Sequence, residues 1–182
     1  VAPRVLVPAA CGENDVNGDA ESPEEAELGA TAPVQVAPDD DLYAHAEDFE
    51  PGEPGDVIAV QPVDTDSDAT VLRVLYHSES LEGEDIAVSG TIIVPEGEPP
   101  TGGRDVLSWA HGTTGIADQC APSRNPGGAE FGIIDEFLER DMVFAATDYE
   151  GLGTPGVHPY VVGESEGRGA LDLVRAAIHL AH

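Results

Sequence analysis

The pentapeptide at residues 163–167 has the spacing Gly-x-Ser-x-Gly and is centred on Ser165. This spacing is typical of a nucleophile elbow, in which a strained turn between a buried strand and a helix exposes a serine hydroxyl. Only residues 160–162 are available for such a strand here, and residues 148–162 show no helical period that could connect two parallel strands. The competing interpretation, which we prefer, makes Ser165 the N-cap of a helix with an acidic first turn.

A nucleophilic serine also needs an acid and a histidine, which follow it along the chain where an elbow of this type is used. After Ser165 the non-adjacent acid is Asp172, and the histidines are His179 and His182. All three fall on one predicted helix, which cannot fold back to present them to the serine. We therefore expect the acid and the histidine, and also the nucleophile, to be absent from these 182 residues.

The stretch 105–115, Asp-Val-Leu-Ser-Trp-Ala-His-Gly-Thr-Thr-Gly, is the second candidate for chemistry. Its first half is apolar enough for a buried strand, and its second half is a small turn flanked by glycines. A turn of this kind can direct backbone N–H groups at one point, which is the geometry of an oxyanion hole. An ordinary strand followed by a glycine-rich loop fits these residues equally well.

Asp148 directly follows the apolar run 142–147. Polar residues at the carboxyl end of a parallel strand often belong to a site, but an aspartate before Tyr149 could equally fix a turn. The cysteines and histidines lack zinc-type spacing, and the acidic segments 15–19 and 64–68 lack the glycine and final glutamate of a calcium loop. We expect neither a metal nor a cofactor.

The chain carries 36 acidic residues against seven basic residues, and its formal net charge is −29. All seven basic residues are arginines. Such a charge argues against nucleic acid or an anionic membrane surface as a partner, because phosphate would be repelled. It is compatible with a protein kept soluble at high salt, where repulsion between its own charges is screened.

Hydrophobic periodicity predicts an α/β fold. Two alternating segments, 71–77 and 86–94, form an antiparallel hairpin after a short strand at 57–60. Two strands of parallel-sheet character, within 105–110 and 142–147, flank a helix at 129–140. A last helix runs from Glu164 nearly to the end of the chain. It carries one apolar stripe, formed by Leu171, Val174, Ile178 and Ala181.

The N-terminal 55 residues differ in composition from the predicted α/β domain. Residues 1–11 look like the end of a bacterial lipoprotein signal, with Cys11 as the lipidated residue, although a cleaved signal remnant or a plain tail also fits. Residues 12–55 are rich in Asp, Glu, Pro, Gly and Ala, which predicts a disordered acidic tether. The folded domain is expected to cover residues 56–182. Cys120 is the other cysteine, and its pairing stays open.

Several motifs in a fixed order resemble the secretory (lipase A-like) family of α/β-hydrolases: residues 109–115, 117–122, 148–156, 158–160 and 163–168. The resemblance covers about residues 56–182 and implies the N-terminal half of an α/β-hydrolase fold. In that family the elbow serine lies on the strand after the helix that ends this chain. The resemblance implies Thr113 or Thr114 as the oxyanion donor. It gives supporting roles to His111, Gly112, Asp148 and Tyr149.

The resemblance implies an exported carboxylic-ester hydrolase, a lipase or esterase, that acts on a small-molecule or lipid ester through an acyl-serine intermediate. A fragment without the triad would be inactive alone. Three alternatives remain: a peptidase of the same fold, an acyl-esterase of the same fold, and a non-catalytic surface lipoprotein or binding module. Lipidation at Cys11 would tether the protein to a membrane.

Overall fold

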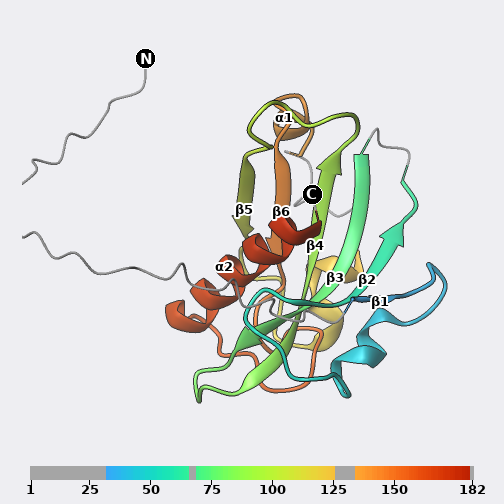
Figure 1. Cartoon of the computed structure of the whole chain (residues 1–182). Coiled ribbons are helices and arrows are strands. Elements are labelled where there is room, and N and C mark those ends of the chain that lie inside the picture. Colours follow the sequence, from blue (N-terminus) through green and yellow to red (C-terminus); the bar gives the residue numbers. More distant parts are fainter. Residues whose placement is uncertain (1–31, 66–68, 126–133, 181–182) are drawn as a thin grey trace, which may run out of the picture.

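The computed structural model describes residues 32–65, 69–125 and 134–180 (Figure 1). Six strands form one mixed sheet in the order β1-β2-β3-β4-β6-β5. The strands are β1 Val34–Gln35, β2 Val57–Val63, β3 Ala69–Glu79, β4 Asp85–Pro95, β5 Val106–Ala110 and β6 Val143–Thr147. The helices are η1 Leu42–Ala46, η2 Asp118–Cys120, η3 Pro122–Arg124, α1 Ile134–Leu138 and α2 Gly163–Leu180. The described part of α1 lies inside the predicted helix 129–140, of which residues 129–133 lie outside the described residues.

The expected hairpin is confirmed. β3 and β4 pair antiparallel without interruption from Ala69 opposite Pro95 to Glu79 opposite Asp85. Residues of both strands are buried on both faces in the middle of the hairpin, because helices and loops cover each side of the sheet. The alternation in the sequence predicted the two strands, but it did not indicate that both faces of their middle parts are buried.

β5 and β6 are parallel, as their apolar runs indicate, and β6 also pairs antiparallel with β4. Every residue of β6 is buried, which is typical of a parallel strand covered on both faces. β5 and β6 run in the same direction, so their carboxyl ends lie at the same end of the sheet. His111 and Asp148, the residues that follow these strands, therefore leave the sheet at this end, which is the lower end in Figure 1.

Helix α2 crosses one face of the sheet, in front of β6 and β4 in Figure 1. Its core-facing residues include Leu173, Ala176 and Ala177, which pack against side chains of β3 and β4. The predicted apolar stripe was wrong as a core face, because Leu171 is 63% exposed and Ile178 is 43% exposed. The observed core face therefore combines one large side chain, Leu173, with two small ones, Ala176 and Ala177.

The predicted tether extends too far along the chain. From residue 32 onward the chain packs on the domain: β1 pairs parallel with β2, and Val36, Leu42 and Ala46 are buried against side chains of β2 and β3. These apolar residues are spaced too widely to show a period, so composition alone suggested disorder. Residues 1–31, including Cys11, lie outside the described residues. No helix in the described ranges is long and apolar enough to cross a membrane.

Candidate active site

The loop after β5 is anchored by His111, which is largely buried. Its Nδ1 lies 2.6 Å from the carbonyl oxygen of Gly112, and its Nε2 lies 3.4 Å from the carbonyl oxygen of Asp148. The carbonyl oxygen of His111 accepts a hydrogen bond from the Tyr149 hydroxyl at 3.1 Å. His111 therefore links the ends of β5 and β6 through its ring and its carbonyl oxygen.

Beyond His111 the backbone turns outward and is exposed at Gly112, Thr113 and Thr114. The Thr113 hydroxyl shares a hydrogen bond of 2.9 Å with the Tyr160 hydroxyl, which comes from the loop after β6. Within the described residues, no hydrogen bond uses the backbone N–H of Thr113 or Thr114. Two free N–H groups on an anchored loop are the elements an oxyanion hole requires.

Asp148 is fully buried and receives three hydrogen bonds. Its carboxylate accepts from the Ser89 hydroxyl of β4 at 2.6 Å, from the Ser123 N–H at 2.9 Å, and from the Ser123 hydroxyl. The Ser123 hydroxyl also contacts the Tyr43 hydroxyl at 2.7 Å. Asp148 thus joins β4, β6 and η3, and it faces into the protein rather than toward a ligand.

Burial raises the pKa of Asp148 above its ordinary value, because the charged carboxylate loses its hydration. The hydrogen bonds from Ser123 and Ser89 oppose this shift, since they stabilise the charged form. Of the two interpretations of Asp148, its contacts match the one in which it fixes the chain.

Ser165 lies in neither of its predicted positions. Helix α2 begins at Gly163, so Ser165 sits inside the first turn and is not the N-cap. Residues 160–162 form a turn instead of a strand, so the backbone of an elbow is also missing. Ser165 is 2% exposed, and its hydroxyl donates a hydrogen bond to the Glu150 carboxylate at 2.5 Å. A serine that donates to a carboxylate is not aligned with an imidazole base.

Aromatic rings connect the two loops beside Thr113. The ring centroids of His111 and Tyr149 are 4.5 Å apart, those of Tyr149 and His158 are 6.2 Å apart, and those of His158 and Tyr160 are 6.1 Å apart. Tyr149 has a φ of +73°, an uncommon value for an aromatic residue that the surrounding contacts must hold. Together with the hydrogen bond between Thr113 and Tyr160, these contacts connect the loop after β5 with the loop after β6 at two points, His111 and Thr113.

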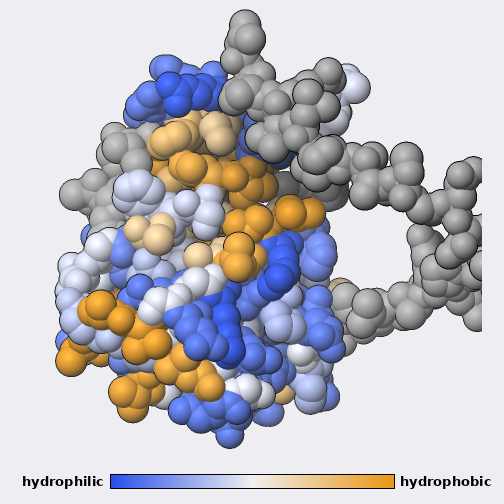
Figure 2. Space-filling view, turned by 90° about the vertical axis from the view of Figure 1, so that its left-hand side faces the viewer, coloured by the Kyte–Doolittle hydropathy of each residue, from blue (hydrophilic) through white to orange (hydrophobic). Residues whose placement is uncertain are grey.

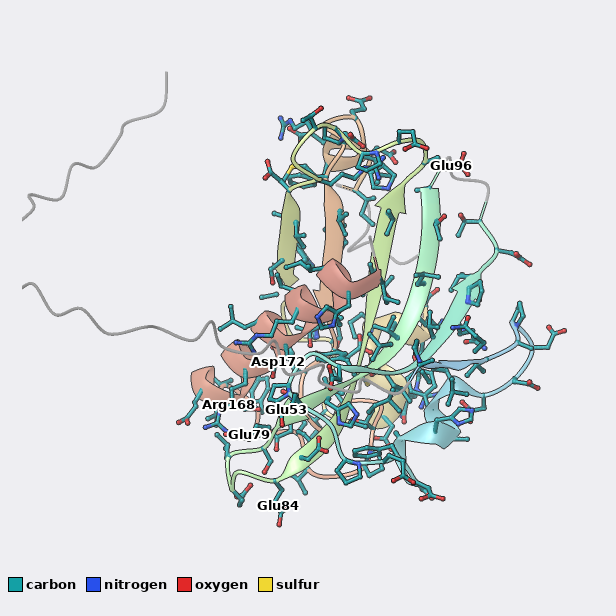
Figure 3. The ribbon with its side chains drawn as sticks, in the orientation of Figure 1. Glu53, Glu79, Glu84, Glu96, Arg168 and Asp172 are labelled. Carbon is teal, nitrogen blue, oxygen red and sulfur yellow. The ribbon has the colours of Figure 1, made fainter. Side chains whose placement is uncertain are left out.

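Sequence reasoning missed Ser89 and Ser123, and it assigned no role to His158 and Tyr160, although both lie in the motif at residues 158–160. Ser89 and Ser123 are 59 and 25 residues away from Asp148 along the chain, and neither lies in a motif. Helix α2 places acidic side chains and Arg168 beside the same end of the sheet (Figure 3), where Arg168 pairs with Glu79 and Glu164. Among the described residues, no group of three or more His, Cys, Asp or Glu could hold a metal ion.

A cavity of about 260 Å³ lies elsewhere, between the segment leading into β2 and the His77 side chain of β3. The sheet order separates β2 and β3 from β5, so this cavity does not adjoin Thr113. The Nδ1 of His77 is bonded to Asp85 at 2.8 Å, and its ring packs edge-on against Phe49. The side chains here tie the N-terminal segment to the hairpin.

The chain resembles solved structures of esterases and lipases. It matches the rice cell wall degrading esterase LipA from Xanthomonas oryzae with a TM-score of 0.58 and 22% identity, over 71% of this chain and 38% of that one. It matches Candida antarctica lipase A in its closed state with a TM-score of 0.60 and 21% identity, over 79% of this chain and 36% of that one.

A putative hydrolase from Legionella pneumophila matches with a TM-score of 0.54 and 27% identity, over 62% of this chain and 30% of that one. No family model matches the sequence, and no curated protein matches it. The fold is therefore part of an α/β-hydrolase, as the sequence indicated. The chain spans about a third of the length of these structural neighbours.

Proposed function

We propose that this chain supplies the oxyanion-binding side of a carboxylic-ester hydrolase. The observation that carries the proposal is a pair of backbone N–H groups, those of Thr113 and Thr114, that have no hydrogen-bond partner in the described part of the chain and lie on a loop held by His111 and Tyr160. Donors fixed in advance stabilise the charge that develops on a carbonyl oxygen when an acyl group is attacked. The esterases and lipase among the structural neighbours support the choice of ester chemistry.

The nucleophile, acid and base of this proposal come from residues other than those described. Within the described ranges no serine hydroxyl is hydrogen-bonded to a histidine. β5 is the edge strand of the sheet, and hydrophobic side chains lie uncovered on the face of the molecule toward β5 (Figure 2). A further parallel strand beside β5, entered from α2, would bring a nucleophile to the edge where Thr113 lies.

The decisive test compares two substitutions at Thr114 in the complete gene product, assayed on a short-chain nitrophenyl ester. Thr114→Pro removes the backbone N–H, whereas Thr114→Ala keeps it. If Thr114 is the donor, the proline variant should lose about 10²–10³-fold in kcat and the alanine variant should not. Thr113→Pro is compared with Thr113→Ser instead, because serine keeps both the backbone N–H and the hydroxyl that bonds to Tyr160. Proline variants that fold, as judged by circular dichroism, and keep full activity at both positions would rule out this oxyanion site.

A second assay addresses the serine that the proposal sets aside. The polypeptide of 182 residues should not hydrolyse the ester. If it does, and Ser165→Ala abolishes turnover, then Ser165 is the nucleophile and the proposal fails. A complete gene product that never turns over an ester or an amide would favour the binding-module alternative, and turnover of amides alone would favour a peptidase.

Export is part of the proposal, as is an acyl chain on Cys11 that tethers the enzyme to a membrane. The substrate is then a small-molecule or lipid ester outside the cell. Growth with radiolabelled palmitate tests the tether directly. Label should enter the wild-type protein and not the Cys11→Ser variant. An unlabelled wild-type protein in a labelled culture would remove the tether and leave the hydrolase proposal intact.

A further inference from the structure

Two arginines stand apart in this acidic chain. Six of the seven arginines lie in described residues, and four of these six form ion pairs with carboxylates. The four are Arg104 with Asp141, Arg140 with Glu136, Arg168 with Glu79 and Glu164, and Arg175 with Asp172. Arg73 and Arg124 make no ion pair within the described ranges, and both line the same cavity.

The cavity has a volume of about 270 Å³ and lies between η1, the β2–β3 pair and η3. Its buried wall includes Gln61, which is 1% exposed. The Gln61 amide donates to the carbonyl oxygens of Ala37 at 2.7 Å and Asp40 at 2.8 Å, and its Oε1 accepts from Nη1 of Arg73 at 3.1 Å. Gln61 is thus fixed by the backbone and in turn orients the guanidinium group of Arg73.

Arg73 uses little of its hydrogen-bonding capacity. A guanidinium group carries five N–H donors, and the bond to Gln61 is the one hydrogen bond that the Arg73 guanidinium group forms within the described residues. Its Nε is buried without a partner there. Buried donors are normally satisfied, so the Nε of Arg73 is available to an acceptor that a ligand supplies.

Arg124 brings a second guanidinium group to the cavity in a fixed plane. Its guanidinium carbon lies 3.6 Å from the centre of the Tyr43 ring, and its nitrogens donate to the carbonyl oxygens of Asp118 and Gly153. Burial is the main cause that raises the pKa of Tyr43 to about 12, and the negative charge of Asp148 is the second cause. The positive charges of Arg124 and Arg73 oppose this rise. Both guanidinium groups therefore act on the same phenol, although neither is neutralised by a carboxylate among the described residues.

We propose that this cavity binds a small carboxylate between Arg73 and Arg124. Guanidinium groups present paired N–H donors that match the two oxygens of a carboxylate. The lining also includes Asp39, Asp40 and Asp41, which are exposed and would repel an anion of higher charge. A singly charged carboxylate is therefore preferred over phosphate. The site is separate from the Thr113 loop and does not depend on the proposed hydrolase activity.

The test is titration of the full chain with ¹³C-labelled acetate, at constant ionic strength set with sodium chloride. Acetate binding should saturate, as followed by the acetate line width. Arg73→Gln and Arg124→Gln should each weaken binding at least tenfold. Arg140→Gln is the matched control, because Arg140 pairs with Glu136 on the surface, and this variant should bind like the wild type. Inorganic phosphate is titrated in parallel and should bind more weakly than acetate.

Several results would overturn the proposal. Acetate broadening that does not saturate, or that persists in Arg73→Gln and Arg124→Gln, would show nonspecific association. Phosphate binding tighter than acetate would contradict the preference for a carboxylate. If the glutamine variants do not fold, Arg73→Lys and Arg124→Lys replace them, since lysine keeps the charge but loses the paired donors. Folded lysine variants with wild-type affinity for acetate would also refute the site.

Discussion

Replacing Asp148 with alanine should destabilise the fold substantially. The substitution leaves the Ser123 N–H and the hydroxyls of Ser89 and Ser123 without their acceptor. A buried donor without a partner costs about 1–3 kcal/mol, and the N–H, which cannot turn to another acceptor, should contribute most. Removing a buried carboxylate also removes its desolvation cost, which offsets part of the loss. We therefore expect the free energy of unfolding to fall by about 2–4 kcal/mol.

Urea unfolding followed by circular dichroism measures this change. With a slope of about 2 kcal/mol per molar urea, the midpoint should fall by about 1–2 M. Asp105→Ala is the matched control, since Asp105 is exposed, and its free energy of unfolding should stay within about 0.5 kcal/mol of the wild type. If Asp148→Ala unfolds at the same urea concentration as this control, the carboxylate cluster does not stabilise the end of β6 and the reasoning is wrong.

The companion variant Asp148→Asn gives the sign of the pH dependence. Because the pKa of Asp148 is raised in the folded state, its protonated form favours folding. The contribution is fully present below the unfolded carboxyl value and is lost as pH rises through the higher folded value. Asparagine does not ionise, so Asp148→Asn should gain stability relative to the wild type as pH rises through this window. A difference that is constant with pH would contradict the raised pKa.

Three further predictions concern packing and charge. Tyr76→Phe removes a buried hydroxyl that contacts Thr147 Oγ1 at 2.7 Å and a carbonyl of α2, and should lower the free energy of unfolding by about 1–3 kcal/mol in the same urea assay. Gly115 has a φ of +135°, and a methyl group at this position would meet the Cys120 thiol. Gly115→Ala should therefore loosen the loop and increase the rate at which Cys120 reacts with a thiol reagent, measured in a Cys11→Ser background. An unchanged rate would argue against this contact. Potassium chloride at about 2 M should raise the melting temperature relative to about 0.1 M, because screening weakens repulsion among 36 acidic residues, and a melting temperature independent of salt would exclude this effect.

The sheet was predictable from the sequence where burial imposes a strict pattern. β3 and β4 alternate because each successive side chain meets the opposite face, and β6 is continuously apolar because both its faces are covered. The parallel pairing of β5 and β6 follows from the helix between them. Local patterns were sufficient for these elements because each one repeats the same environment along its length.

Elements that depend on contacts between distant segments were not predictable. The packing of Val36 and Leu42 depends on β2 and β3, which the composition of their own segment does not reveal. The buried face of α2 is formed by Leu173, Ala176 and Ala177 and leaves Leu171 exposed, which the apolar stripe of the helix alone does not reveal. The role of Ser165 was wrong for a related reason, since its hydroxyl bonds to Glu150, from the loop that precedes the helix.

For the candidate site, the sequence predicted the loop and the supporting residues His111, Asp148 and Tyr149, but not the side chains that bond to Asp148. His111 and the threonines after it stand out because a strand runs into a small, glycine-flanked segment. The acceptor role of Asp148 requires Ser89 and Ser123, which are 59 and 25 residues away. A single sequence carries no signal for such pairs when each residue is of an ordinary type.

The position of Asp148 connects stability to the proposed chemistry. Its side chain holds Ser123, while its backbone carbonyl meets Nε2 of His111, the residue that begins the loop with the free N–H groups. An oxyanion donor is effective only if its position is fixed before the reaction. Loss of the Asp148 carboxylate should therefore displace the loop through His111, even though no atom of Asp148 would touch the substrate. In the complete gene product, Asp148→Ala should lower kcat more than it changes KM, whereas destabilisation by Val36→Ala, in the separate core cluster beside β2, should leave kcat of the folded fraction unchanged.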